Sequence, residues 1–192
     1  MTQALRRPVN KPMLYAQVGS DLERHEAFRR HAYPDPLSLL ARKYRRLPWG
    51  FKPARQLLAQ IPEGEEHGIP WTVGIGFAVG VTPDHIMELP MARQKLKEKL
   101  VYYWNELTKV IPDINEHPFV IQTVFLNMIF NLGRVRLSKF ENTLRFLRER
   151  NYAQVADNLE KSLWYRQTGN RAVELVERVR TNTIKQEHLV RV

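Results

Sequence analysis

The sequence lacks several features that would each point to a particular class of protein. It has no cysteine, which excludes a disulfide framework, a thiolate metal site and a cysteine nucleophile. It also lacks a Gly-rich loop ending in Lys-Ser/Thr, a His-Glu-x-x-His motif and a Gly-x-Ser-x-Gly elbow. His25 and His31 stand six positions apart, which would place them on different faces of a helix. We therefore expect neither a metal ion nor another cofactor.

Long hydrophobic runs are also missing. The most apolar stretch, residues 119–132, is too short to span a bilayer and is interrupted by Gln122, Asn127 and Asn131. The first residues lack the apolar core of a signal peptide. We therefore expect a soluble monomer that is made in a cytoplasm.

Composition then narrows the class further. The chain has 192 residues and 43% apolar side chains, enough for one domain of two lobes with a sizeable core. Its formal net charge of +10 favours polyanionic partners, such as nucleic acid, anionic lipid or the bacterial envelope. Neither a helix-turn-helix nor a pattern of stacking aromatics is present, so we expect no specific nucleic acid partner.

Residues 24–35 carry two acids on different elements. Residues 21–28 favour a helix with Leu22 and Phe28 facing inward, so that Glu26 lies near the helix end. Pro34 disfavours a helical Tyr33, which places Asp35 on a strand or loop. Two carboxylates that enter one cleft from different elements are what cleavage of a glycosidic bond requires. Without further support, Glu26 would more simply be a solvated carboxylate or a partner of a neighbouring arginine.

Residues 71–79 are typical of a strand followed by a turn. Valine and isoleucine alternate with Gly74 and Gly76, and glycine permits a positive φ and a close approach of the backbone. Thr72 opens this Thr-x-Gly-x-Gly sequence.

Between the second acid and this turn lies a basic segment. Residues 36–62 contain six basic side chains and no acid, and apolar residues at helical spacing on both sides of Pro48 predict a helical hairpin inserted between two strands. It either covers apolar surface or forms a basic element that grips the envelope, binds a virion partner or lids the cleft. Glu63, at the end of the segment, is a weaker candidate acid because no aspartate lies between it and Thr72.

The rest of the sequence predicts helices. Thr82 and Pro83 are suited to a helix start, and Leu96, Leu100, Tyr103 and Leu107 form a helical stripe. Residues 118–132 predict a buried central helix that Gly133 ends. Further helices are expected from a Ser138–Glu141 capping box, over residues 152–163, with Val155, Leu159 and Leu163 as its apolar positions, and over residues 170–179. Asn127 is expected to be a hydrogen-bonded group inside the lobe.

The order and spacing of these motifs resemble the phage-type lysozymes, the muramidases of tailed bacteriophages. Asp35 follows Glu26 by nine positions, and the Thr-x-Gly-x-Gly turn follows in turn. The second half is most similar to the lysozyme of T-even phages, through residues 126–133, 157–162 and 164–172. Three positions depart from the pattern: Ala27 stands where Gly usually follows the acid, Phe77 where His usually ends the turn, and Leu163 where the T-even protein has Arg.

The resemblance implies an α+β, mainly helical, lysozyme-like fold of two lobes. An arm (residues 1–20) precedes a small lobe with the active-site acid and a β-hairpin (21–85), which holds the helical insertion (about 36–66). A long helix (86–108) then leads to a helical lobe (109–192). The implied activity is hydrolysis of the β-1,4 bonds between N-acetylmuramic acid and N-acetylglucosamine in peptidoglycan, with inversion. Glu26 would be the general acid, Asp35 and Thr72 would hold the attacking water, and the sugar contacts would be Phe130, Asn131, Thr143 and Asn158.

Two other functions stay open at this point. The chain could be a catalytically inactive, lysozyme-like structural module of a phage particle, although it keeps all three groups, Glu26, Asp35 and Thr72. A nucleic-acid binder rests on charge alone. An active enzyme is expected to lyse the host or penetrate its wall. It would reach the wall either from the host cytoplasm through a holin-type pore or as part of the virion.

Overall fold

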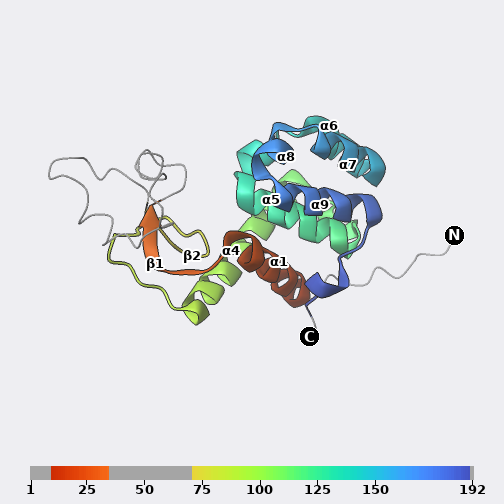
Figure 1. Cartoon of the computed structure of the whole chain (residues 1–192). Coiled ribbons are helices and arrows are strands. Elements are labelled where there is room, and N and C mark those ends of the chain that lie inside the picture. Colours follow the sequence, from red (N-terminus) through yellow and green to blue (C-terminus); the bar gives the residue numbers. More distant parts are fainter. Residues whose placement is uncertain (1–9, 35–70, 191–192) are drawn as a thin grey trace. The chain divides into compact units, whose positions relative to one another are not determined.

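The computed structural model describes residues 10–34 and 71–190 and divides the chain into two compact units (Figure 1). The described part of the helical unit comprises residues 10–25 and 97–190, and that of the sheet unit comprises residues 26–34 and 71–96. Helix α4 (Leu89–Val110) contributes residues to both units. Most described residues are helical and one small antiparallel sheet is present, which confirms the predicted α+β, mainly helical class.

The sheet unit is built on two antiparallel strands, β1 (Arg29–Pro34) and β2 (Trp71–Gly74), with Tyr33 opposite Thr72. The other edge of β1 is also paired. Ala32 N donates to the carbonyl of His85 at 3.0 Å, and Met87 N donates to the carbonyl of Arg30 at 2.8 Å. The prediction of a helix starting at Thr82 and Pro83 is therefore wrong, because the backbone of residues 85–87 pairs with β1 and the helix begins only at Leu89.

Helix α1 (Lys11–Glu26) begins well before the predicted start near Asp21 and ends at Glu26 rather than at residue 28. Its buried apolar positions, Leu14, Val18 and Leu22, follow a strict i, i+4, i+8 spacing. The sequence did not reveal the helical periodicity of these residues, because the same face also buries Gln17 and Asp21. The polar partners of these two side chains come from distant parts of the chain. Residues 11–20 of the predicted arm form the first part of this helix.

The centre of the helical unit is α5 (Phe119–Leu137), which is buried nearly all round from Ile121 to Ile129, as predicted. Gly133 has a φ of +73° and interrupts the helical geometry where a C-cap was predicted. The other elements are η1 (Ile114–Glu116), α6 (Glu141–Arg148), α7 (Tyr152–Glu160), α8 (Leu163–Thr168), α9 (Asn170–Thr181) and η2 (Gln186–His188). Helix α9 packs against α5 and α7, and α6 packs against α7.

Two local predictions in this unit are wrong in detail. No side-chain cap forms at the start of α6, because Ser138 Oγ donates to the carbonyl of Val135 at 2.9 Å instead of capping the next helix. The helix predicted over residues 152–163 ends at Glu160, and Ser162 caps the new helix α8 by accepting a hydrogen bond from Tyr165 N. As a result Leu163 is an exposed residue at the start of α8 rather than part of the core.

Asn127, on α5, also differs from its prediction. Its side chain is fully buried, but neither amide atom has a hydrogen-bond partner among the residues that the structure describes.

The predicted helical hairpin, Asp35 and Glu63 all lie outside the described residues. Of the helices that the structure describes, none is both long and apolar enough to cross a membrane.

Candidate functional site

The sheet unit places Glu26 beside the glycine turn. Glu26 is the last residue of α1, and Ala27, with a φ of +52°, turns the chain toward β1. The Glu26 side chain is half-buried, and its Oε2 lies 3.9 Å from the position that a Cβ on Gly76 would occupy. The predicted acid therefore lies at a helix end and faces the turn that follows β2, so these two sequence motifs meet in space.

The turn itself depends on glycine. Val73 and Phe77 exchange backbone hydrogen bonds of 2.8 and 3.0 Å across it. Gly74 has a φ of +68°, and a Cβ added there would lie 2.7 Å from Met87 Sδ. Both the backbone conformation and the space around Gly74 exclude a side chain, so the turn requires glycine at this position.

Thr72 is a buried threonine whose hydroxyl has no hydrogen-bond partner within the described part of the chain. The residue is 4% exposed, lies in β2 opposite Tyr33, and its Oγ1 makes no hydrogen bond to any residue that the structure describes. A buried hydroxyl without a partner costs free energy, so such groups are rare and often serve a function. The hydroxyl can donate to a carboxylate or hold a water molecule, as its predicted role requires. Asp35, the predicted second acid, follows the last described residue of β1.

Two of the four predicted sugar contacts lie near the end of the buried helix α5. Phe130 is half-buried, and its ring packs edge-on against Tyr103 with centroids 5.4 Å apart. Asn131 is exposed, and its Oδ1 accepts a hydrogen bond of 3.1 Å from Trp164 Nε1. Trp164 therefore orients the side-chain amide of Asn131. The sequence alone did not predict this role for Trp164.

The other two contacts lie on separate helices. Thr143, on α6, is buried, whereas Asn158, on α7, is half-buried and donates from Nδ2 to the carbonyl of Gln154 at 3.0 Å. Helices α6 and α7 pack against each other within the helical unit. Asn158 offers its side-chain oxygen to a ligand more readily than the buried Thr143 offers its hydroxyl.

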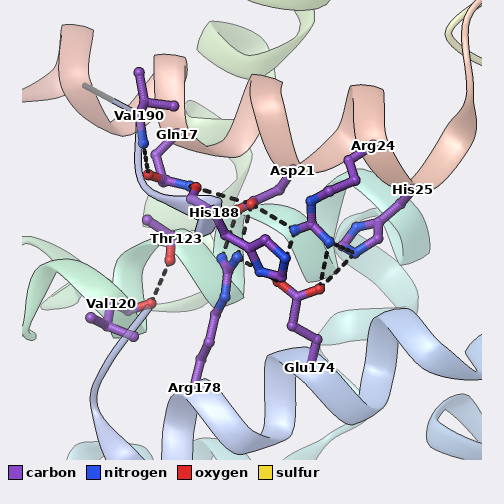
Figure 2. A network of polar contacts seen from close by, with 10 residues as sticks. All are labelled: Gln17, Asp21, Arg24, His25, Val120, Thr123, Glu174, Arg178, His188 and Val190. Carbon is purple, nitrogen blue, oxygen red and sulfur yellow. Dashed lines mark hydrogen bonds and ion pairs between the residues drawn. The ribbon is translucent and has the colours of Figure 1, made fainter. Parts of the chain in front are cut away.

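A polar cluster at the C-terminal end of α1 was not anticipated (Figure 2). Arg178, on α9, donates two hydrogen bonds to the buried Asp21, and Glu174, one turn earlier on α9, accepts from Arg24 and Arg178. Burial by itself raises the pKa of Glu174, but the hydrogen bonds from His25 and Arg24 and the nearby arginine charges outweigh it and lower this pKa strongly. The cluster fastens α1 to α9 through charged groups, which hydrophobic periodicity cannot reveal.

Two residues that follow α9, His188 and Val190, also contact this cluster. Gln17 Nε2 donates to the carbonyl of His188 at 2.8 Å, and Val190 N donates to Gln17 Oε1 at 3.0 Å (Figure 2). His188 Nδ1 lies 3.1 Å from Glu174 Oε1. Although histidines and carboxylates meet here, no group of three or more such ligands within residues 10–34 and 71–190 has the arrangement needed for a metal ion.

Comparison with known proteins defines the class. The sequence matches the family model "Phage lysozyme" over residues 55–182, about two thirds of the chain. The chain belongs to the phage lysozyme family, which confirms the resemblance seen in the sequence. The matched residues include Thr72 and the four predicted sugar contacts, but they begin after Glu26 and Asp35.

One curated relative is the protein named "Probable T4-type lysozyme 2" from Dictyostelium discoideum, which is 33% identical over 60 residues. The aligned segment covers 31% of this chain and 35% of that protein. The chain thus matches about a third of the length of this relative.

Proposed function

We propose that the protein is a muramidase that hydrolyses the β-1,4 bonds between N-acetylmuramic acid and N-acetylglucosamine in bacterial peptidoglycan. The proposal is carried by one observation, the position of the Glu26 carboxylate beside the glycine turn that follows the strand of Thr72, whose buried hydroxyl has no hydrogen-bond partner among the described residues. Membership of the phage lysozyme family supports the same reaction and the same polymer.

In the proposed mechanism Glu26 protonates the glycosidic oxygen as its bond to the anomeric carbon breaks. A water molecule, held by Thr72 and Asp35, attacks that carbon from the opposite face and passes a proton to Asp35. The products are a new reducing end and a free hydroxyl on the leaving sugar, with inversion at the anomeric carbon. The role of Asp35 rests on the sequence, because the residue lies outside the described part.

The first test replaces the acid. Glu26→Gln should lower the release of reducing ends from purified peptidoglycan at least about 100-fold, the usual contribution of a general acid. Glu23→Gln, in the preceding turn of α1, is the matched control and should retain activity. Proton NMR of the first product formed should show the inverted anomer. Full activity in Glu26→Gln would contradict the assignment, and no activity in the parent would favour a structural module of a phage particle.

The second test separates a functional hydroxyl from a structural one. Because Thr72 Oγ1 has no described partner, Thr72→Val should leave the protein as stable as the parent or more stable. If the hydroxyl holds the attacking water, the same variant should lose activity about tenfold or more, and Thr72→Ser should recover part of it. A stable Thr72→Val protein with parental activity would remove Thr72 from the mechanism.

The biological setting follows from the substrate. We propose that the enzyme serves host lysis or wall penetration, either after release through a holin-type pore or as a virion component. Residues 36–66 are the proposed contact for an anionic envelope or a virion partner. Mass spectrometry of purified particles distinguishes the two settings, because only a virion enzyme would co-purify with them.

A further inference from the structure

Three aromatic side chains form a continuous ridge on the helical unit. Tyr102 and Tyr103, on α4, lie edge to face with ring centroids 5.2 Å apart, and Tyr103 makes the same kind of contact with Phe130, on α5, at 5.4 Å. Exposure increases along the ridge, since Phe130 and Tyr103 are half-buried and Tyr102 is 59% exposed. We call these three residues the aromatic ridge.

The outer end of the ridge has no role in the core. Edge-to-face contacts are favourable at these separations, but they hold Tyr102 at the surface, where most of its ring remains in water. Tyr103 is partly buried, and this partial burial raises the pKa of its hydroxyl. Such a surface suits a ligand with one apolar face and many hydroxyls, which is the character of a pyranose ring.

A polar contact holds the two helices together beside the ridge. Glu106, about one turn after Tyr103 on α4, forms an ion pair with Arg134, whose Nε lies 2.9 Å from Glu106 Oε2, just beyond the break in α5 at Gly133. The two helices are therefore joined by two successive contacts, one aromatic and one ionic. The ridge is preorganised, so a bound sugar would not have to order it. The guanidinium of Arg134 is half exposed, so one side of this positive charge remains open to a ligand.

We propose that the aromatic ridge is an additional sugar-binding surface, on which Tyr102 and Tyr103 extend the contacts of Phe130 and Asn131 along the peptidoglycan strand. This inference rests on the proposed muramidase function. Tyr102 stacks on the apolar face of a sugar ring beyond the one at Phe130, and Arg134 faces the acidic groups of the peptide stem attached to muramic acid. The chain would therefore prefer long glycan strands to short ones.

The experiment uses the full chain carrying Glu26→Gln and a soluble, unlabelled peptidoglycan strand of at least six sugars as the probe. Calorimetry should show about tenfold weaker binding for Tyr102→Ala, the loss expected when one stacked ring is removed. Val101→Ala, a truncation of the exposed neighbour on the same helix, is the control and should bind like the parent. Circular dichroism should show that both variants keep the fold, because both side chains lie at the surface.

A second readout separates binding from chemistry. In the active enzyme, Tyr102→Ala should raise KM for long strands about tenfold, leave kcat unchanged, and leave KM for a disaccharide-repeat dimer unchanged. Parental binding and kinetics in Tyr102→Ala would overturn the ridge while leaving the muramidase assignment intact. An inactive parent that binds no glycan would overturn both proposals, and the Glu26 assay identifies that case separately.

Discussion

Asp21, on α1, and Arg178, on α9, form a bidentate ion pair inside the helical unit, with hydrogen bonds of 2.6 and 2.8 Å. Their side chains are only 1% and 3% exposed. Both charged groups are shielded from water, so each relies on the opposite charge of the other for compensation. The pair binds the first helix of the chain to its last long helix, 157 positions apart in sequence.

Removal of one member of this pair should be costly. Arg178→Met leaves the Asp21 carboxylate buried with Gln17 and Arg24 as its remaining partners, so the free energy of unfolding should fall by about 3–5 kcal/mol in urea titrations. Arg180→Met, two positions later, removes only exposed ion pairs and should cost less than about 1 kcal/mol. Equal losses of unfolding free energy in the two variants would contradict the larger stabilisation predicted for the buried pair.

Gly74 and Gly80 provide a matched pair for the glycine turn. Both have a φ near +70°, but an added Cβ meets Met87 Sδ at 2.7 Å only at Gly74, and nothing within 4 Å at Gly80. Gly80→Ala should therefore cost about 1 kcal/mol from backbone strain alone. Gly74→Ala should cost a further 1–3 kcal/mol, roughly, because Met87 is buried and cannot move aside freely. Thermal unfolding measures both, and equal shifts would contradict the predicted clash.

Ala27 is a non-glycine residue in the left-handed region, with a φ of +52°, directly after the proposed acid. Ala27→Gly should raise the free energy of unfolding by up to about 1 kcal/mol, because glycine adopts this conformation without strain. Ala153→Gly, at an exposed position inside α7, should lower it by about 0.5–1 kcal/mol. Destabilisation by both substitutions would show that Ala27 is not strained in solution.

His117 should make the protein sensitive to mild acid. Its ring is buried between Asp113, 3.3 Å from Nε2, and the hydroxyl of Tyr152, 3.1 Å from Nδ1. Burial and the charge of Arg150 lower the pKa of His117, although Asp113 and Glu116 act in the opposite direction. At a pH below 6.5, the usual pKa of histidine, the unfolded chain therefore binds a proton at His117 that the folded chain does not. The free energy of unfolding consequently falls as the pH drops.

This pH dependence can be measured as a difference between two proteins. Between pH 7.5 and 5, the unfolding free energy of the parent should fall by up to about 1.4 kcal/mol per pH unit more than that of His117→Gln. The comparison cancels the contributions of the other histidines. Parallel pH profiles would show that His117 does not titrate differently in the folded state.

Local rules were enough to predict the parts of the site that lie on single elements. Pro34 predicted the extended chain after Glu26, and β1 runs through Pro34. Glycine at 74 and 76 predicted a turn that needs positive φ, which both residues have. The stripe of Leu96, Leu100, Tyr103 and Leu107 predicted α4, and its three leucines are buried together, whereas Tyr103 is half-buried.

Predictions failed where a partner distant in sequence decided the outcome. Thr82 and Pro83 carry signals for a helix start, yet residues 85–87 pair with β1, because its second edge needs hydrogen bonds. The capping box at Ser138 failed for a local reason instead, because its hydroxyl donates to the carbonyl of Val135, three residues earlier. The role of Asp35 and the hairpin of residues 36–62 stay predictions, since both lie outside the described residues.

The sequence by itself determined the family, the helical character and the order of the acid, the strand and the glycine turn, because these follow from motif spacing and from short-range backbone preferences. Only the tertiary structure decided that Glu26 faces Gly76, that Thr72 is buried without a hydrogen-bond partner among residues 10–34 and 71–190, and that α1 begins at Lys11. Each of these depends on groups that the fold brings together from distant positions. No pattern along the chain encodes which buried polar atom will find a partner and which will not.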